Sequence, residues 1–177
     1  MNPIVKDTTL SGVKLIVTDR FEDYRGELGG VYDEDKYASC GLDSRFVYDM
    51  VSMSYKNVLR GMHGDCETTK LVGCLYGTVY SVVMDCDEAS SEFGKWQSFI
   101  LSDKNHHQLY IPPLYGNGYY VLSDISIYTY KMSKPHSDSQ FTYAWNDPRF
   151  GIRWPTSSPI LSARDDVLVP SAPKKEA

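Results

Sequence analysis

Short apolar segments recur along this chain and limit what it can fold into more than any other feature. Several alternate apolar with polar side chains, which is typical of half-buried strands, and turn-forming clusters such as Pro112–Gly118 separate them. No long helical pattern lies between them, as a parallel βαβ fold would require. We therefore predict an all-β sandwich or jelly roll with strands near Val13–Thr18, Arg45–Asp49, Val58–Met62, Lys70–Leu75, Thr78–Met84, Trp96–Leu101, Gln108–Ile111, Tyr119–Leu122 and Ser126–Lys131.

Helical patterns are restricted to two short stretches. Asp33–Cys40 and Asp147–Gly151 are helical or turn-like, so we expect only short peripheral helices. The length of 177 residues fits one domain that spans 1–177. From Pro170 the chain combines proline, serine and adjacent lysines, and we predict that this tail is loose.

Charge and composition exclude several classes of partner. The formal charge of −5 leaves no positive footprint for a nucleic acid, whereas a nucleotide-sized anion needs only a few arginines. Met1–Leu10 lacks a signal-peptide pattern and no apolar run is long enough for a bilayer, so we expect a cytoplasmic protein without a membrane partner. The four cysteines show no CxxC spacing, which argues against both zinc and a disulfide framework.

Three cationic or protonatable side chains lie within apolar, strand-like sequence. Arg60 and His63 belong to Asn57–Asp65, and Lys70 opens the next apolar run. A single histidine in such a run is usually a satisfied core residue. Unpaired buried charge is costly, however, so three such groups on neighbouring strands predict a functional site.

A jelly-roll fold raises the question of whether the chain binds a metal ion. Metal-binding cupins use two histidines one residue apart, a glutamate shortly after and a later histidine. Here Asp65 follows His63 at that spacing, and the later strand offers Asn117. The pair His106-His107 lies in a polar turn-like stretch, and His136 follows Pro135 in a loop and receives no role. We predict no metal and no cofactor, so that acid and base side chains carry the chemistry.

Several short motifs follow one another along the chain: Phe21-Glu-Asp-Tyr-Arg-Gly26, Phe46-Val-Tyr-Asp-Met-Val-Ser-Met-Ser54, Asn57-Val-Leu-Arg-Gly-Met-His63, Lys70-Leu-Val72, Ser90-Ser-Glu-Phe-Gly-Lys-Trp96, Leu101-Ser102, Ile111-Pro-Pro113, Tyr130-Lys131, Trp145-Asn-Asp-Pro148, Ile152-Arg-Trp-Pro155 and Leu161-Ser-Ala-Arg-Asp165. In this order they resemble the dTDP-4-dehydrorhamnose 3,5-epimerase family over about residues 14–166. The resemblance implies a metal-free, cupin-type jelly roll, usually a homodimer, that epimerises nucleotide-linked 4-keto sugars.

The resemblance also implies catalytic roles that suit this chemistry. A 4-keto group acidifies the C–H bonds at C3 and C5, so epimerisation needs a base, an acid on the opposite face and a cation near the keto oxygen. By resemblance, His63 is the base and Asp165 orients it. Lys70 lies against the developing enolate, and Tyr130 returns a proton from the far face.

The implied substrate contacts centre on two arginines. By resemblance Arg60 and Arg25 bind the pyrophosphate, Arg25 often from the partner subunit, since the guanidinium fork suits a diphosphate. The full set of expected substrate-binding residues is Arg25, Arg60, Asn117, Ser52, Glu27 and Tyr48.

This chain departs from the rhamnose-type pattern at positions expected around the sugar and phosphates. The family carries Gln, Asn and His at Tyr48, Met50 and Val51, and Ala-His-Gly-Phe at Gly116-Asn117-Gly118-Tyr119. The variant resembles the branch that acts on GDP-linked 4-keto-6-deoxy-heptoses for bacterial capsules. It leaves open whether C3, C5 or both centres invert.

Other functions remain open at this point. The substrate can instead be the dTDP-linked sugar of the ordinary rhamnose enzymes. A non-catalytic sugar-nucleotide-binding jelly roll is favoured if His63 and Tyr130 do not face one cavity. A single-centre isomerase, such as a 3,4-ketoisomerase, needs a further histidine near the site, and a purely structural oligomer leaves the cationic side chains unexplained.

Overall fold

The computed structural model describes residues 3–42 and 45–166, and strands are the main regular secondary structure in these ranges. The strands are β1 (Ile4–Asp7), β2 (Lys14–Val17), β3 (Phe21–Asp23), β4 (Gly26–Leu28), β5 (Tyr48–Tyr55), β6 (Leu59–Asp65), β7 (Lys70–Tyr76), β8 (Thr78–Asp85), β9 (Trp96–Ser102), β10 (His107–Ile111), β11 (Tyr115–Val121), β12 (Ile125–Met132) and β13 (Gln140–Thr142). One helix, α1 (Glu34–Ser39), lies among the described residues.

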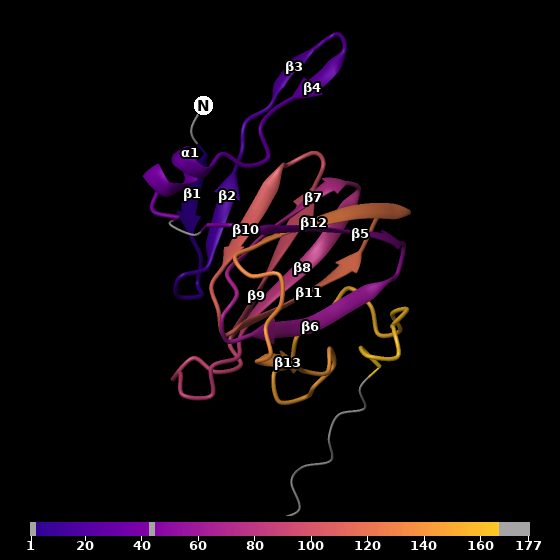
Figure 1. The fold of residues 1–177 in the computed structure, drawn as a ribbon. Coiled ribbons are helices and arrows are strands. Elements are labelled where there is room, and N and C mark those ends of the chain that lie inside the picture. Colours follow the sequence, from indigo (N-terminus) through magenta and orange to yellow (C-terminus); the bar gives the residue numbers. More distant parts are fainter. Residues whose placement is uncertain (1–2, 43–44, 167–177) are drawn as a thin grey trace, which may run out of the picture.

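Two antiparallel sheets form a sandwich (Figure 1). Six strands pair in the order β1-β2-β10-β7-β12-β5, and five in the order β13-β6-β11-β8-β9. The main core lies between the sheets and draws on both of them. Tyr119 from β11 and Tyr128 from β12, for example, stack with ring centroids 4.2 Å apart, and both are fully buried. Burial of such large apolar surfaces is the main force that joins the two sheets.

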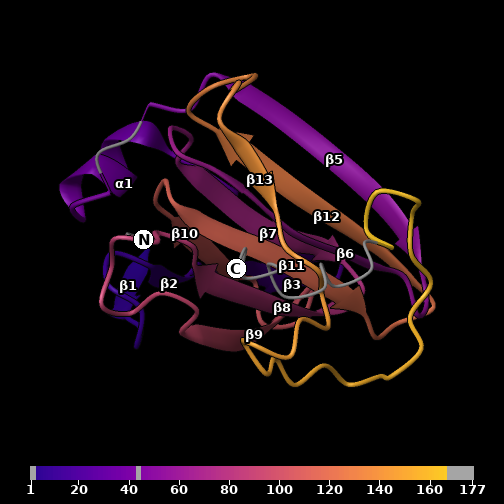
Figure 2. The ribbon, with the colours of Figure 1, turned by 90° about the horizontal axis from the view of Figure 1, so that it is seen from below.

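A small hairpin stands apart from the sandwich. Strands β3 and β4 pair with each other alone and project away from the two sheets (Figure 1). The hairpin leads into α1, whose first turn is capped because the Asp33 carboxylate accepts a hydrogen bond from the backbone N–H of Lys36 at 3.1 Å. At the other margin β5 is an edge strand beside β12 (Figure 2).

The predicted all-β jelly roll and its short peripheral helix are confirmed. Helix α1 falls within Asp33–Cys40, and Asp147–Gly151 contains turns rather than a helix. No helix in the described ranges is long and apolar enough to cross a membrane. The predicted loose tail from Pro170 lies outside the described residues.

Two strand predictions were wrong in their bounds. The strand expected at Arg45–Asp49 is β5, which starts at Tyr48 and pairs with β12 over its whole length. The expected turn region Pro112–Gly118 contains the start of β11, because Gly116-Asn117-Gly118 pair with β8. The glycines in this region are typical of turns, but here they mark a close approach of two strands. The sequence patterns also missed β1, the β3–β4 hairpin and β13.

Candidate active site

A cavity of about 320 Å³ opens between the two sheets. Strands of both sheets line it, and so do the segment after β12 and a residue near Asp165. The lining consists of Tyr48, Met50, Arg60, His63, Gly64, Asp65, Thr68, Lys70, Asn117, Tyr130, Met132, Lys134, Pro135, His136, Ser137, Gln140 and Arg164. Six of the residues predicted from sequence therefore share one cavity: His63, Lys70, Tyr130, Arg60, Asn117 and Tyr48.

An irregularity in the β6–β11 pairing explains how Arg60 and His63 both line the cavity. Side chains three positions apart face opposite sides of a regular strand. Here His63 pairs with Asn117 and Arg60 pairs with Tyr119, so two residues of β6 oppose only Gly118. A bulge of this kind re-aims side chains and is frequent beside active sites.

His63 is bonded to a buried carboxylate. Its Nε2 lies 2.5 Å from Oδ1 of Asp165, which is 3% exposed, and the Ser162 hydroxyl donates to Oδ2 at 2.9 Å. Burial by itself would raise the pKa of the Asp165 carboxyl, but hydrogen bonds from His63 and Ser162 outweigh it and hold that pKa below its usual value. The ionised carboxylate accepts the Nε2 proton, so in the neutral ring Nδ1 carries the free lone pair.

Lys70 is a buried cation without a carboxylate in ion-pair contact among the described residues. Its ammonium donates to Oδ1 of Asn117 at 3.1 Å and to the backbone carbonyl of His63 at 3.3 Å. Burial lowers the pKa of Lys70, and Asp65 and Cys86 oppose the shift only in part. Since an ammonium has three N–H groups, one remains for a group inside the cavity.

Tyr130 presents a protonated phenol to the same cavity. Burial is the main reason that the pKa of Tyr130 lies well above its usual value, while a hydrogen bond with Ser52 and the charge of Arg60 act against the shift. The hydroxyl therefore keeps its proton at neutral pH and can donate it. The ring packs edge-on against Tyr128 at 5.0 Å, which fixes its direction.

Ser52 belongs to a hydrogen-bonded group behind the cavity wall. Its hydroxyl lies 2.7 Å from the Tyr119 hydroxyl, which is 3.1 Å from that of Ser54. Arg60 donates through Nε to Ser54 at 3.0 Å. This group holds the Arg60 side chain and leaves the outer guanidinium nitrogens for the cavity.

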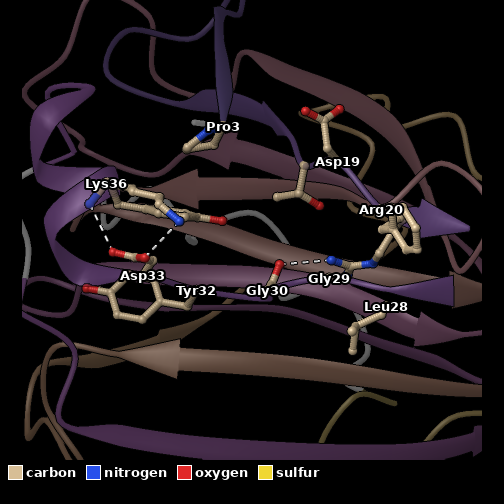
Figure 3. Close-up of a pocket in the computed structure, with 12 residues that line it drawn as sticks. Pro3, Asp19, Arg20, Leu28, Gly29, Gly30, Tyr32, Asp33 and Lys36 are labelled. Atoms are coloured by element: carbon tan, nitrogen blue, oxygen red, sulfur yellow. Dashed lines mark hydrogen bonds and ion pairs between the residues drawn. The ribbon is translucent and has the colours of Figure 1, made fainter. Parts of the chain in front are cut away.

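Three predicted substrate-binding residues do not line this cavity: Ser52, which lies behind its wall, Arg25 and Glu27. Arg25 is on the projecting hairpin, where it pairs with Asp23 at 2.6 Å. Glu27 on β4 pairs with Nε2 of His106 at 2.9 Å. Figure 3 shows a separate hollow at the base of the hairpin, where Arg20 donates to the Gly30 carbonyl at 2.8 Å. Within this chain the structure does not bring Arg25 or Glu27 to His63.

One expected position was wrong. Val51 was expected around the sugar and phosphates, but it does not line the cavity and is 62% exposed. Tyr48 and Met50, which were expected there as well, do line the cavity, because alternation along β5 turns Val51 to the other face of the sheet.

Sequence patterns missed one wall of the cavity. The segment after β12 supplies Lys134, Pro135, His136 and Ser137, although its sequence looks like an ordinary polar loop and His136 was given no role. The available signal was its position directly after the strand that carries Tyr130.

Among the described residues, no cluster of three or more His, Cys, Asp or Glu side chains is placed to hold a metal ion.

The fold and this cavity define a cupin-like jelly-roll enzyme with a histidine–carboxylate pair, a buried ammonium and a protonated phenol. The sequence profile of the dTDP-4-dehydrorhamnose 3,5-epimerase family matches residues 7–171. The chain belongs to this family, whose members are named as epimerases and are therefore isomerases.

Individual relatives agree with this assignment. The chain is 38% identical to the dTDP-4-dehydrorhamnose 3,5-epimerase of Escherichia coli over 167 residues, which cover 91% of this chain and 90% of the relative. It is 37% identical to the enzyme of that name from Neisseria gonorrhoeae over 90% of its own length, but spans only 50% of that relative. The crystal structure of RmlC, a dTDP-6-deoxy-D-glucose-3,5-epimerase from Legionella pneumophila in complex with dTDP-4-keto-L-rhamnose, matches with a TM-score of 0.87 at 33% identity, covering 93% of this chain and 90% of that chain.

Proposed function

We propose that this protein epimerises a nucleotide-linked 4-keto-6-deoxy sugar at C3, C5 or both centres. The observation that carries the proposal is that His63, held by Asp165, lines one cavity together with Lys70 and Tyr130. The family assignment supports the same reaction. A non-catalytic binding module does not need a base, an acid and a cation around one cavity.

The proposed reaction consists of two proton transfers. Nδ1 of His63 takes the proton from the carbon next to the ketone, and the C–H electron pair moves to give an enolate. The Lys70 ammonium offsets the charge on the enolate oxygen, where a preorganised cation in a site of low dielectric is most effective. The Tyr130 hydroxyl then protonates the carbon from the opposite face, and solvent restores both side chains. Asp165 stabilises the imidazolium between the two transfers.

We propose a GDP-linked 4-keto-6-deoxy-heptose, a precursor of capsule or other surface polysaccharide, as the substrate. Tyr48, Met50 and Asn117 line the cavity at positions where rhamnose-type enzymes carry Gln, Asn and His, so the contacts to substrate must differ. A second candidate is the dTDP-linked sugar. The names of the relatives, and the dTDP-4-keto-L-rhamnose bound to the Legionella protein, favour it.

Two measurements test the proposal. Incubation with GDP- and dTDP-linked 4-keto sugars in deuterated water shows by mass and NMR whether deuterium enters at C3, at C5 or at both. Calorimetric titration with GDP and with dTDP then compares the nucleotides, since the pyrophosphate contacts are common to both. Tighter GDP binding supports the heptose substrate, and tighter dTDP binding supports the rhamnose-type substrate. Absence of exchange with every sugar contradicts the catalytic proposal.

We also propose that the protein works as a homodimer in which the hairpin reaches the partner's cavity. Arg25 lies on a hairpin that projects from its own protomer, and the hairpin residues Phe21 and Leu28 are 66% and 74% exposed. Val51, Met53 and Tyr55 along the edge strand β5 are also exposed. Apolar side chains on an unpaired edge and a projecting hairpin favour a contact with a second copy.

A further inference from the structure

One wall of the cavity is held without any strand pairing. The segment 133–139 joins β12 to β13 and has no regular secondary structure. It nevertheless lines the cavity with four consecutive residues from Lys134 to Ser137. Contacts with the turn that joins β6 to β7 hold it: one backbone hydrogen bond, from the Ser133 N–H to the Thr69 carbonyl at 3.0 Å, and several side-chain contacts.

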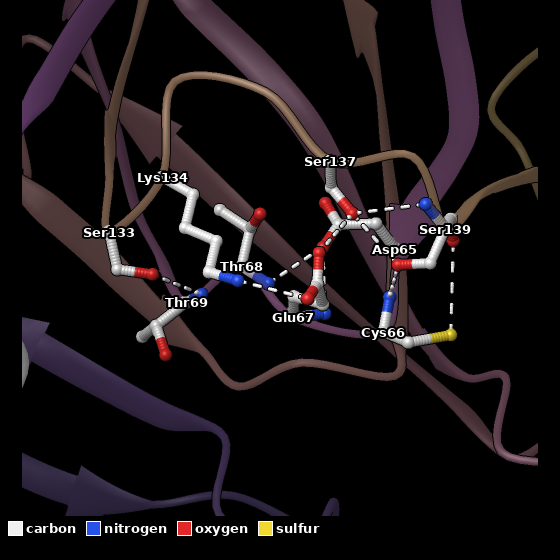
Figure 4. A network of polar contacts seen from close by, with 9 residues as sticks. All are labelled: Asp65, Cys66, Glu67, Thr68, Thr69, Ser133, Lys134, Ser137 and Ser139. Atoms are coloured by element: carbon white, nitrogen blue, oxygen red, sulfur yellow. Dashed lines mark hydrogen bonds and ion pairs between the residues drawn. The ribbon is translucent and has the colours of Figure 1, made fainter.

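Glu67 in that turn binds two residues of the wall at once (Figure 4). Oε1 accepts a hydrogen bond from Lys134 Nζ at 2.9 Å, and Oε2 accepts one from the Ser137 hydroxyl at 3.0 Å. Asp65 shapes the turn, because its Oδ1 accepts from the backbone N–H of Glu67 at 2.9 Å and of Thr68 at 2.6 Å. Asp65 thus fixes the backbone of Glu67 in a position from which the Glu67 carboxylate contacts the wall.

Three of the contacts form a chain of hydrogen bonds that runs from Cys66 through Ser139 and Ser137 to Glu67. The backbone N–H of Cys66 donates to the Ser139 hydroxyl at 3.2 Å, which lies 2.8 Å from the Ser137 hydroxyl. Because the ionised carboxylate only accepts, Ser137 must donate to Glu67 and accept from Ser139. At the start of the wall, Thr69 N–H donates to the Ser133 hydroxyl at 2.9 Å.

The residues assigned to the chemistry do not depend on these contacts. Tyr130 pairs with Met50 of β5 and Val72 of β7, so ladders on both sides hold it. His63 is held by Asp165. In the proposed reaction the 4-keto sugar lies against these residues, which leaves the other lining residues for the nucleoside diphosphate. Four of those fourteen residues, Lys134 to Ser137, belong to the wall.

We propose that Glu67 is a positioning residue that holds the wall 133–139 and thereby sets the affinity for the nucleoside diphosphate half of the substrate. This inference rests on the proposed function. Removal of Glu67 weakens substrate binding but leaves proton transfer at saturation intact, because the wall moves while His63, Lys70 and Tyr130 stay in place.

Kinetics of Glu67→Ala, Glu67→Gln and Ser137→Ala test the proposal. We expect Glu67→Ala to raise KM and the dissociation constants of GDP and dTDP about three- to tenfold, with kcat within about twofold of wild type. Glu67→Gln keeps an acceptor oxygen and has a smaller effect. In the double variant Glu67→Ala/Ser137→Ala the loss of affinity is smaller than the sum of the two single losses, since both changes remove the Glu67–Ser137 contact.

Hydrogen exchange gives a readout that does not depend on activity. Peptides that cover 133–139 exchange faster in Glu67→Ala, while peptides from β7 and β12 do not change. Glu92→Gln is the matched control, because Glu92 also pairs with a surface lysine, Lys95, but does not line the cavity. Unchanged exchange in 133–139, or a fall in kcat without a change in affinity, overturns the proposal. If wild type catalyses no epimerisation, the proposed function fails, whereas exchange and diphosphate titration still decide the role of Glu67.

Discussion

At the level of single residues, the surroundings of His63 and Tyr130 suit them to different roles, one as a base and the other as an acid. His63 contacts an ionised carboxylate, which leaves one ring nitrogen basic. Tyr130 is surrounded by other tyrosines, and burial keeps its phenol protonated. A histidine bound to a carboxylate and a buried phenol on one cavity are the kinds of groups that a two-face proton transfer requires.

Replacement of His63 tests the base. His63→Asn removes the basic nitrogen while keeping a side chain of similar polarity. We expect deuterium incorporation at both C3 and C5 to fall by roughly 10²- to 10⁴-fold, the usual contribution of a positioned base. NMR of the sugar in deuterated water measures it, and incorporation near the wild-type rate contradicts the assignment.

Replacement of Tyr130 separates abstraction from inversion. Tyr130→Phe removes the proton donor but leaves His63 in contact with Asp165. We expect proton exchange without inversion to persist while the epimerised product forms at least about tenfold more slowly. Chiral analysis of the product alongside deuterium content distinguishes the two, and a normal inversion rate identifies a different donor.

Replacement of Lys70 tests the cost of a buried cation. The folded-state pKa of Lys70 lies below the unfolded value near 10.5, so the charged form destabilises the fold at neutral pH. That penalty disappears as pH rises through the lowered pKa toward the unfolded one. We therefore expect the stability of Lys70→Met relative to wild type to decline between pH 7 and 10. Urea unfolding across that range measures the difference, and a relative stability that rises with pH contradicts it.

At the level of strands, glycines on β6 and β11 allow the bulge through which both Arg60 and His63 line the cavity. A Cβ on Gly118 would lie 2.9 Å from the Arg60 carbonyl oxygen and 3.0 Å from Met62 Sδ. The two strands are therefore closer than most residues allow. The glycines of β11 are also the reason that the predicted start of this strand was wrong.

Substitution of Gly118 tests this close approach. We expect Gly118→Ala to lower the free energy of unfolding by about 1–3 kcal/mol through overpacking, and to reduce activity because Arg60 and His63 shift. Gly30→Ala is the control, since nothing lies within 4 Å of its added Cβ. Denaturant unfolding of both variants is the measurement, and wild-type stability of Gly118→Ala contradicts the role of the glycine.

At the scale of the whole molecule, the projecting hairpin leaves the cavity of one protomer without Arg25. The proposed dimer completes each cavity with the partner's hairpin. His63→Asn and Arg25→Ala then lie on different subunits of the same site, and a mixed dimer contains one site free of both substitutions.

Subunit mixing tests this arrangement. We expect the two variants, each weakly active alone, to recover about a quarter of wild-type activity when equal amounts are unfolded and refolded together, because random pairing makes half of the dimers mixed and each has one intact site. Activity assays before and after mixing, with light scattering for the mass, give the result. Activity that stays at the average of the two separate variants contradicts the shared site.

The layered β fold, the family and six of the side chains that line the cavity could be predicted from the sequence alone. Alternating apolar runs report burial on one face of a sheet, and the ordered motifs carry Arg60, His63, Lys70 and Tyr130. These signals are local, or depend only on order along the chain. The alternating runs and the ordered motifs can therefore be recognised without knowing how the side chains pack.

Only the tertiary structure decided how these residues meet. Asp165 reaches His63 across 102 positions of sequence, and the bulge between β6 and β11 turns Arg60 into the cavity. Alternation along β5 turns Val51 away, and Glu67 holds the wall through contacts that span 67 and 70 positions of sequence. Such contacts depend on strand register and loop placement, which many distant residues set together and no short motif records.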